Sequence, residues 1–293
     1  MGFESYHPAI NLIYFVSTLT AAILFRQPVF LSVSYLSAFA YSVKRGGRKA
    51  LIFNLCLIPL IAVFALYYSG YHHFGLTVLR QNLIGNNMTV ESLLCGLDFG
   101  VIAASVVMWM SCVFSVFTAD KVVYLFGRIS PKLSLFLSIL LRTVPRLKVQ
   151  AKKISTARKA VGKGVDQGNF FQRLGNAVKI FSMLVTWLLE SMTITSDSMR
   201  SRGYALKGRS AFSIYRFDNR DRSLVIGLFA CLTISMMGYL LGETQVWFDP
   251  QIVMNPITMA SCVFYCGYAA LCLLPVTLEL WSEYRFRKMR CRL

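Results

Sequence analysis

The stretch Ser201-Arg202-Gly203-Tyr204 ends a long predicted helix about two-thirds of the way along this chain. It lies in a basic, largely hydrophilic segment, residues 119–222, which has groups of long apolar runs on both sides. The segment contains 20 of the 31 Lys and Arg residues but only 6 of the 13 Asp and Glu residues. We therefore predict that this segment carries the functional surface of the protein and that the apolar runs anchor it in a membrane.

The composition of the whole chain indicates a membrane protein. Of its 293 residues, 56% are hydrophobic and 15% are charged, and the mean hydropathy is +0.55, whereas about 25% of the residues of a soluble domain are charged. The apolar runs cover residues 9–25, 28–43, 51–68, 92–118, 223–241 and 258–281. Several approach the ~20 residues that a helix needs to span a bilayer. The sequence predicts an all-α, polytopic helical membrane protein with about six spans, although the first two runs are short and also fit a tilted or partial hairpin.

The distribution of positive charge predicts the orientation. Residues 44–49 carry four cations between two apolar runs, and the tail carries Arg285, Arg287, Lys288, Arg290 and Arg292. Because cytoplasmic loops are enriched in Lys and Arg, both termini and residues 119–222 are predicted to be cytoplasmic. The start of the chain shows no cleavage pattern of a signal peptide, so the first apolar run is expected to be retained.

Three regions follow from this pattern. Residues 1–118 form an N-terminal membrane region with about four spans. Residues 119–222 form a cytosolic helical segment between spans 4 and 5, and residues 223–293 form a C-terminal membrane region with about two spans and a basic tail. The net charge of +18 also fits a membrane-anchored nucleic-acid binder, but the cations lie almost entirely outside the apolar runs. That placement favours membrane topology together with a protein contact surface, and no nucleic-acid partner is predicted.

Capping residues predict two long helices in the cytosolic segment. Ser130 followed by Pro131 begins the first helix, and Gly162 ends it. Asn169 begins the second, with Gln172 completing a capping box. The second helix carries an apolar stripe with heptad spacing that predicts a helical partner, either the preceding helix or the inner ends of the spans. The stripe consists of Phe171, Leu174, Val178, Phe181, Val185, Leu188, Met192, Thr195 and Met199.

Residues 176–192 of this helix are apolar enough to be taken for a further span. The run is about 17 residues long, which is the lower limit for a span. It also contains Lys179 and Glu190, and as a span it would place the basic residues that follow on the outer side. We therefore predict that it lies in the cytosol or at the membrane surface.

Both long helices end in a basic turn followed by glycine. Arg158 and Lys159 precede Gly162, and Arg202 directly precedes Gly203. Cations near a helix C-terminus offset the helix dipole, which accounts for either end taken alone. Two such ends on helices that pack together predict a paired, exposed, cationic tip that is suited to a groove on a partner protein.

Patterns of catalytic or metal-binding residues are absent from the sequence. It has no phosphate-binding G-x-x-x-x-G-K-[ST] loop, and its histidines are only His7, His72 and His73. Its eight cysteines lie mostly in apolar runs and form no Cys-x-x-Cys pair, so no metal or cofactor is predicted. Asp98 is the one carboxylate well inside an apolar run, which makes it a functional candidate, although a position near the outer end of its helix also lets it reach water.

Four stretches resemble a known family. They are Phe117-Thr118-Ala119-Asp120 through Pro131, Leu141-Arg142-Thr143-Val144-Pro145, Gly168-Asn169-Phe170-Phe171-Gln172-Arg173-Leu174 and Ser198-Met199-Arg200-Ser201-Arg202-Gly203-Tyr204. Together they resemble the transmembrane component of energy-coupling factor (ECF) transporters of the cobalt and vitamin type. The His7-Pro8 opening is similar to the start of that family. The likeness covers most of the chain and is most specific from about Thr118 to Tyr204.

The resemblance implies a non-enzymatic coupling subunit of an importer for vitamins or metal ions. In that family, two cytosolic coupling helices each end in a short Ala-Arg-Gly-like motif, and each motif arginine docks into a groove on one of two ABC ATPase subunits. The further partner is a small substrate-binding membrane subunit. The implied location is the plasma membrane of a bacterium or archaeon. The alternatives are a membrane-embedded enzyme and a stand-alone carrier.

The two family motifs fall on the two glycine-terminated helix ends. By position, Ser201-Arg202-Gly203 matches the second motif closely, whereas the first aligns with Ala160-Val161-Gly162, where valine replaces the arginine. Either a neighbouring cation (Arg158, Lys159 or Lys163) supplies the charge there, or the ATPase partner has a less acidic groove on that side. The resemblance therefore predicts unequal contacts with the two ATPases.

Overall fold

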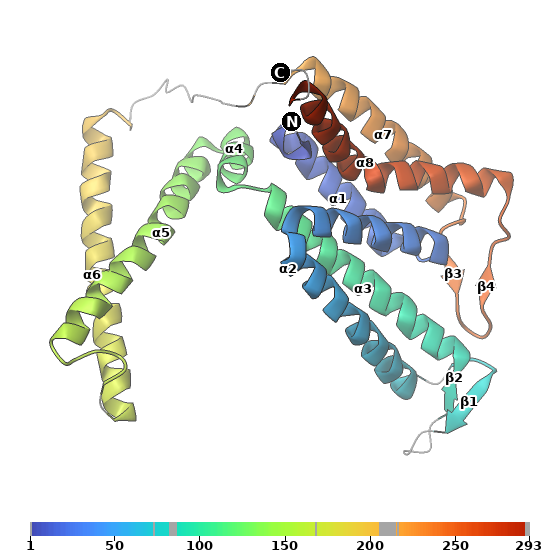
Figure 1. The fold of residues 1–293 in the computed structure, drawn as a ribbon, viewed down its shortest axis with the longest axis horizontal. Helices are drawn as coiled ribbons and strands as arrows, with labels where there is room; N and C mark the ends of the chain where they lie inside the picture. The colour runs from blue at the N-terminus through green and yellow to red at the C-terminus, as the bar shows by residue number, and fades with distance from the viewer. Residues whose placement is uncertain are drawn as a thin grey trace. The chain divides into compact units, whose positions relative to one another are not determined.

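The computed structural model describes residues 2–72, 74–81, 87–167, 169–204, 215 and 217–290 (Figure 1). The α-helices are α1 (Pro8–Leu24), α2 (Pro28–Tyr71), α3 (Val90–Val116), α4 (Ala119–Ile129), α5 (Pro131–Ala160), α6 (Phe170–Ser201), α7 (Asn219–Leu240) and α8 (Met259–Arg290). A 3-10 helix, η1 (Phe3–Ser5), precedes α1. Strands β1 (Val78–Gln81) and β2 (Asn87–Thr89) pair antiparallel between α2 and α3, and β3 (Val246–Trp247) and β4 (Val253–Met254) do so between α7 and α8.

The chain divides into two compact units. The first, which we call the membrane unit, comprises Met1–Thr118 and Tyr215–Leu293, and the second, the basic unit, comprises Ala119–Ile214. Helices α1, α2, α3, α7 and α8 belong to the membrane unit, and α4, α5 and α6 belong to the basic unit. Each unit therefore has its own packing and is described by itself.

Helix α2 consists of two arms joined at a sharp bend. Gly47 has φ 60° and ψ −143°, a backbone conformation that is open essentially to glycine alone. Ser42 Oγ donates a hydrogen bond of 3.4 Å to Asn54 Oδ1, although a straight helix would place these residues about 18 Å apart. The two apolar runs were expected to be separated by a loop at residues 44–49. That loop prediction is wrong in detail, because the helical hydrogen-bonding pattern continues on both sides of a single non-helical glycine.

The membrane unit has two ends, between which its helices run. At one end, the bend of α2 contacts η1, the end of α3 and α8 through the side chains of Lys44 and Arg45. We call this the basic end. At the opposite end, the turn between α1 and α2 donates two backbone hydrogen bonds, from Arg26 N and Gln27 N, to Thr244 O in the connection that follows α7. The β-hairpins lie in the connections of this second end.

Aromatic side chains fill the core of the membrane unit. Phe3, Tyr14, Phe15 and Trp109 contact one another edge to face, and Trp109 Nε1 donates a hydrogen bond of 3.3 Å to Ser34 Oγ on α2. Helices α2 and α3 approach closely where Gly96 faces α2, since a Cβ at Gly96 would lie 3.0 Å from the backbone oxygen of Ala65. The core therefore joins η1, α1, α2 and α3 into one packed body.

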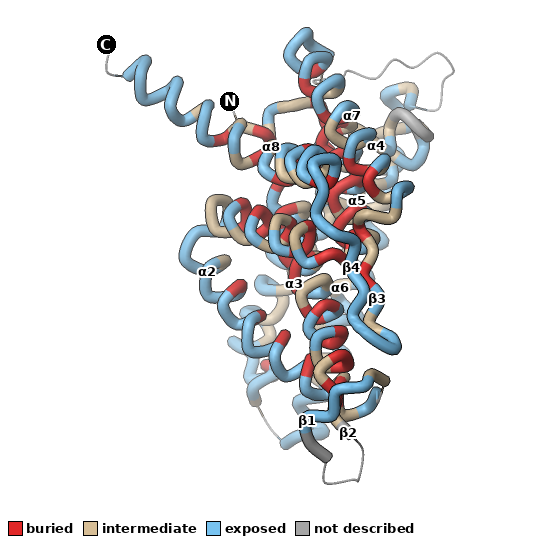
Figure 2. Tube along the Cα trace, turned by 90° about the vertical axis from the view of Figure 1, so that its right-hand side faces the viewer, coloured by how far each residue is buried: buried red, intermediate tan, exposed pale blue. Residues whose placement is uncertain are grey.

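The outer surface of the membrane unit is apolar. Leu36, Leu60, Val63 and Phe114 are each more than 60% exposed, and Figure 2 shows long exposed stretches on α2.

Among the described residues of both units, five helices (α2, α3, α6, α7 and α8) are long and apolar enough to cross a membrane, and α1 is a shorter apolar helix. The fold is thus that of an all-α, polytopic membrane protein, as the composition predicted, while the number of about six spans stays a prediction.

In the basic unit, α5 and α6 pack antiparallel and cross each other (Figure 1). Arg158 near the end of α5 contacts Asn176 in the first half of α6, and Arg146 near the middle of α5 lines a shared hollow with Glu190 in the second half of α6. Helix α5 continues through Pro145 without a break. Helix α6 contains no fully buried residue, so its helical conformation is stabilised by its own hydrogen bonds and by one-sided contacts with α5.

Candidate functional site

The two glycine-terminated ends of α5 and α6 have the same backbone geometry. Val161, the C-cap of α5, has φ −89° and ψ 10°, and Arg202, the C-cap of α6, has φ −84° and ψ 9°. The next residues, Gly162 and Gly203, have φ 74° and 75°. These left-handed values favour glycine, because a Cβ would clash with the backbone there. Val161 therefore occupies in the first end the position that Arg202 occupies in the second.

The hydrogen bonds at the two ends also correspond. At the end of α5, Gly162 N donates to Lys159 O (3.1 Å) and Lys163 N donates to Arg158 O (2.9 Å). At the end of α6, Gly203 N donates to Arg200 O (3.1 Å) and Tyr204 N donates to Met199 O (3.2 Å). This pattern is a Schellman motif, which satisfies the last carbonyl groups of a helix and fixes where the chain leaves it. Both ends are thus rigid ends of helices rather than loop segments.

The cations next to Val161 are engaged with the loop that follows α5. The Arg158 guanidinium donates to Lys163 O and to Asn176 Oδ1, each at 3.4 Å. Lys159 Nζ lies 3.2 Å from Asp166 Oδ2 in an exposed ion pair. Arg158 therefore folds back over its own loop and ties it to α6. Val161 itself is 73% exposed, so the outermost side chain of the first end is apolar.

The second end presents a cation. Arg202 and Ser201 are both exposed, and Ser201 Oγ donates a hydrogen bond of 3.0 Å to Ser198 O within its own helix. Gly203 is half-buried and Ala160, in the first end, is exposed. The predicted site residues thus lie at the surface of the basic unit, with an arginine at one end and a valine at the other.

The two ends do not form the paired tip that the sequence predicted. The end of α5 lies beside Asn176, because Asn176 Nδ2 donates to Gly164 O (3.1 Å) in the loop after α5. Asn176 and Arg202 are 26 positions apart on α6, which corresponds to about 39 Å at 1.5 Å per residue. The prediction failed because helices joined by a short loop run antiparallel, so their C-terminal ends point in opposite directions.

The apolar stripe of α6 is covered only in part. Its first residues are strongly exposed, with Phe171 at 83%, Val178 at 60% and Phe181 at 66%, whereas Leu188, Met192, Thr195 and Met199 are half-buried. Within the basic unit, the preceding helix α5 therefore covers only the second half of the stripe, and the other expected partner, the inner ends of the spans, stays a prediction. Exposed apolar patches rimmed by charge are typical of protein or membrane contact surfaces.

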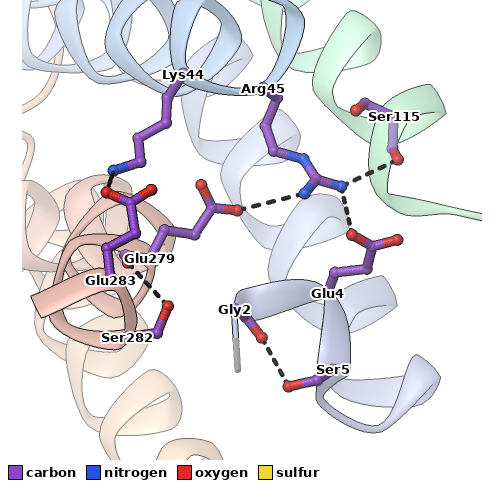
Figure 3. Close-up of polar contacts among 9 residues, drawn as sticks. All are labelled: Gly2, Glu4, Ser5, Lys44, Arg45, Ser115, Glu279, Ser282 and Glu283. Carbon is purple, nitrogen blue, oxygen red and sulfur yellow. Dashed lines mark hydrogen bonds and ion pairs between the residues drawn. The ribbon is translucent and has the colours of Figure 1, made fainter. Parts of the chain in front are cut away.

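A second polar constellation lies at the basic end of the membrane unit (Figure 3). Arg45 on α2 donates to Glu4 Oε2 on η1 (2.8 Å) and to Ser115 O near the end of α3 (3.3 Å). Its other terminal nitrogen lies 3.7 Å from Glu279 Oε1 on α8. A single guanidinium thus links four elements, one of which, α3, ends directly before the basic unit.

Figure 3 also shows a second cation beside this cluster. Lys44 Nζ lies 3.0 Å from Glu283 Oε2, so two successive residues of α2 pair with two carboxylates one helical turn apart on α8. The sequence analysis used residues 44–49 only to predict the orientation and did not pair them with Glu279 or Glu283. The spacing of Glu279 and Glu283, four positions apart on one helix face, was the available signal.

Asp98, the other candidate from the sequence, has a partner. Its Oδ2 lies 3.3 Å from Nε of Arg26, in the turn between α1 and α2, and the Arg26 guanidinium lies 4.5 Å from the centre of the Phe99 ring. The Asp98 side chain is only 6% exposed. The geometry assigns Asp98 a structural contact that fastens the α1–α2 turn to α3. Among the described residues, no three of His, Cys, Asp and Glu come together as a metal site would require.

Comparison with known proteins gives one informative similarity. No family model matches the chain. Over 91 residues, which make up 31% of this chain, it is 33% identical to the energy-coupling factor transporter transmembrane protein EcfT of Lacticaseibacillus paracasei. The matched residues span about a third (34%) of the length of that relative. The chain is therefore similar over part of its length to a membrane component of an ECF transporter.

Proposed function

We propose that this protein is the transmembrane coupling subunit of an ECF-type ABC importer. It links two cytosolic ATPases to a small substrate-binding membrane subunit and has no catalytic activity of its own. The observation that carries the proposal is the pair of rigid, exposed helix ends at opposite ends of α6, in a basic unit joined directly to the membrane unit. The partial similarity to EcfT supports it.

The separation of the two ends fits two partners better than one. Two docking points about 39 Å apart on a single helix pair can each contact a different globular subunit. When ATP draws two ATPases together and hydrolysis lets them separate, ends held in this way are displaced relative to each other. In this proposal α5 and α6 transmit that displacement to the membrane, where the substrate-binding subunit reorients.

Arginine suits a docking point at the second end. Its guanidinium stays protonated and makes planar, bidentate contacts with a carboxylate. The Schellman motif holds the backbone of Arg202 in place, so little conformational freedom of the main chain is lost on docking. We propose an acidic groove on the ATPase that receives Arg202, and a less acidic groove on the ATPase that receives Val161.

The proposed orientation places the basic unit and both termini in the cytoplasm of a bacterium or archaeon, with the membrane unit in the plasma membrane. The basic end of the membrane unit then faces the cytoplasm, in agreement with the enrichment of Lys and Arg in cytoplasmic loops. The transported compound is a vitamin or a metal ion. In this arrangement the separate substrate-binding subunit selects it.

The test is co-purification of the ATPases with variants of the full chain from membranes. Arg202→Glu reverses the charge at the second end and is expected to abolish capture of the ATPases and ATP-driven uptake, with membrane insertion intact. Lys148→Glu makes the same charge change at an exposed residue of α5, about 20 Å from Val161 and between the two ends, and is the matched control. Uptake at the wild-type rate in Arg202→Glu would exclude the docking role of Arg202.

The inequality of the two ends has its own test. Val161→Arg recreates an arginine at the geometrically equivalent position. If the facing groove is less acidic, as we propose, the substitution will leave the affinity for that ATPase unchanged or weaken it. A clear gain in affinity would show that the groove is acidic and that a neighbouring cation, Arg158, Lys159 or Lys163, supplies the charge in the native protein.

A further inference from the structure

A hollow of about 1070 Å³ lies between the first half of α7 and the second half of α8 in the membrane unit. Residues of both helices and Tyr6 line it. The volume is slightly above the range of about 300–1,000 Å³ that is usual for ligand pockets. The hollow plays no part in the proposed coupling function.

One part of the wall of the hollow is apolar, and the other part is cationic. Leu224, Gly227, Leu274 and Leu278 lie within the apolar runs of α7 and α8. Beyond them, towards the end of α8, the chain becomes polar, and the last turns of this helix are exposed (Figure 2). A groove that changes from apolar to cationic along two membrane helices matches the acyl and headgroup regions of a lipid.

Three cations and no carboxylate line the hollow in the described part of the chain. They are Arg220 on α7 and Arg285 and Lys288 on α8. The Arg285 guanidinium lies 4.6 Å from the ring centre of Trp281, and Arg220 reaches Asp218 at 3.5 Å in a pair of exposed side chains. A cationic rim beside an amphipathic tryptophan is typical of the headgroup level of a bilayer.

We propose that this hollow binds an anionic glycerophospholipid, with the phosphate at Arg285 and Lys288 and an acyl chain along Leu224, Gly227 and Leu274. The charge of the rim argues for an anionic lipid over a zwitterionic one. Each basic residue near an anionic lipid surface contributes about 1 kcal/mol, or roughly a fivefold preference. The inference concerns α7 and α8 only and stands whether or not the basic unit docks ATPases.

Gly227 offers a way to fill the groove without disturbing the fold. A Cβ at this position meets no atom within 4 Å, so a larger side chain would extend into open space. Glycine inside a helix is also less favourable than leucine, so the substitution does not weaken α7. Gly227→Leu should therefore exclude an acyl chain and leave α7 helical.

The experiment measures quenching of tryptophan fluorescence by brominated lipids in vesicles that contain the full chain. Vesicles with dibrominated phosphatidylglycerol are compared with vesicles that hold the same mole fraction of dibrominated phosphatidylcholine. Subtracting the signal of Trp281→Phe isolates Trp281, which lines the hollow. Phosphatidylglycerol is expected to quench Trp281 at a several-fold lower mole fraction than phosphatidylcholine.

Two variants and one control decide the origin of the preference. The double variant Arg285→Gln/Lys288→Gln and the variant Gly227→Leu are expected to lose most of the preference for phosphatidylglycerol over phosphatidylcholine. Arg287→Gln/Arg290→Gln removes the same charge from the last turns of the same helix outside the hollow, and it should keep the preference.

Several outcomes would overturn the proposal. One is equal quenching by both lipids in the wild type, and another is an unchanged preference in Arg285→Gln/Lys288→Gln. If the Arg287→Gln/Arg290→Gln control lost the lipid preference as fully as Arg285→Gln/Lys288→Gln, only the general surface charge would matter. Weak quenching by both lipids would show that protein, either a second copy or a partner helix, fills the hollow.

Discussion

Replacing Arg45 by glutamine is expected to destabilise the membrane unit more than any change to an exposed ion pair. The Arg45 side chain is 21% exposed and its partner Glu279 is 9% exposed. Without the guanidinium, the Glu279 carboxylate is left buried beside apolar helices without its cation. Removal of one partner from a buried pair costs 3–5 kcal/mol. Because Arg45 and Glu4, the latter 42% exposed, still reach water, we expect about 2–3 kcal/mol.

Thermal unfolding in detergent micelles with a thiol-reactive dye measures this effect. Cys112 and Cys272 are at most 1% exposed in the folded membrane unit, so the dye labels them only when the core opens. For a unit of this size, 1 kcal/mol shifts the melting temperature by about 2–4 °C. Arg45→Gln should therefore melt about 4–12 °C below the wild type.

The neighbouring pair Lys44–Glu283 provides the matched control. The Glu283 side chain is 53% exposed, and exposed pairs contribute about 0.2–1 kcal/mol. Glu283→Gln removes one charge at the same end of the unit, one helical turn from Glu279, and should lower the melting temperature by only about 0.5–4 °C. A large shift in this control would mean that the total charge of the basic end, and not burial, sets the stability.

The double variant Arg45→Gln/Glu279→Gln tests the physical cause. Removing the stranded carboxylate together with the arginine leaves two neutral amides, so the double variant should be more stable than Arg45→Gln alone. The reasoning is refuted if Arg45→Gln melts within 1–2 °C of the wild type, or if the losses of the two single variants simply add in the double variant.

Three further substitutions test other contacts. Arg26→Gln leaves the buried Asp98 without its cation and should cost about 3 kcal/mol in the same melting assay, whereas an unchanged melting temperature would show that Asp98 is stable without the pair. Gly96→Leu forces α2 and α3 apart and should cost about 1–3 kcal/mol, and wild-type stability would contradict the close approach. Gly203→Ala places a Cβ at φ 75° and should cost about 1–2 kcal/mol, seen as faster hydrogen exchange at Tyr204 N–H.

The sequence predicted the helices well because their signals are local. The apolar runs at 9–25 and 92–118 became α1 (Pro8–Leu24) and α3 (Val90–Val116), and Asn169 with Gln172 forms the expected capping box of α6. Helix α8 extends to Arg290, beyond the apolar run that ends at residue 281, because Arg, Lys and Glu favour helix as much as apolar residues do. The end of an apolar run indicates where the membrane ends, and the helix can continue past it.

Contacts between distant residues could not be predicted in the same way. Arg45 and Glu279 are 234 positions apart, and nothing in either local sequence identifies the other as its partner. The bend at Gly47 was predicted as a loop. Two adjacent glycines between apolar runs are compatible with a loop and with a bend in a continuous helix, and only packing of the two arms of α2 selects the bend. The same holds for the hollow between α7 and α8, whose lining comes from Tyr6 and from two helical segments about 50 residues apart in the chain.

The direction of the two candidate ends follows from one short connection. Only the nine residues between α5 and α6 separate these helices in the sequence, so the end of α5 must stay at the start of α6 whatever the crossing angle between them. Arg202 then lies about 39 Å away, and a change in crossing angle moves it in an arc while Val161 moves little. In the proposed coupling role, the arginine is therefore at the mobile end of the lever and the valine is near its pivot. In that proposal the ionic contact lies where the displacement is large and the apolar contact lies near the pivot, which gives the difference between Arg202 and Val161 a mechanical explanation.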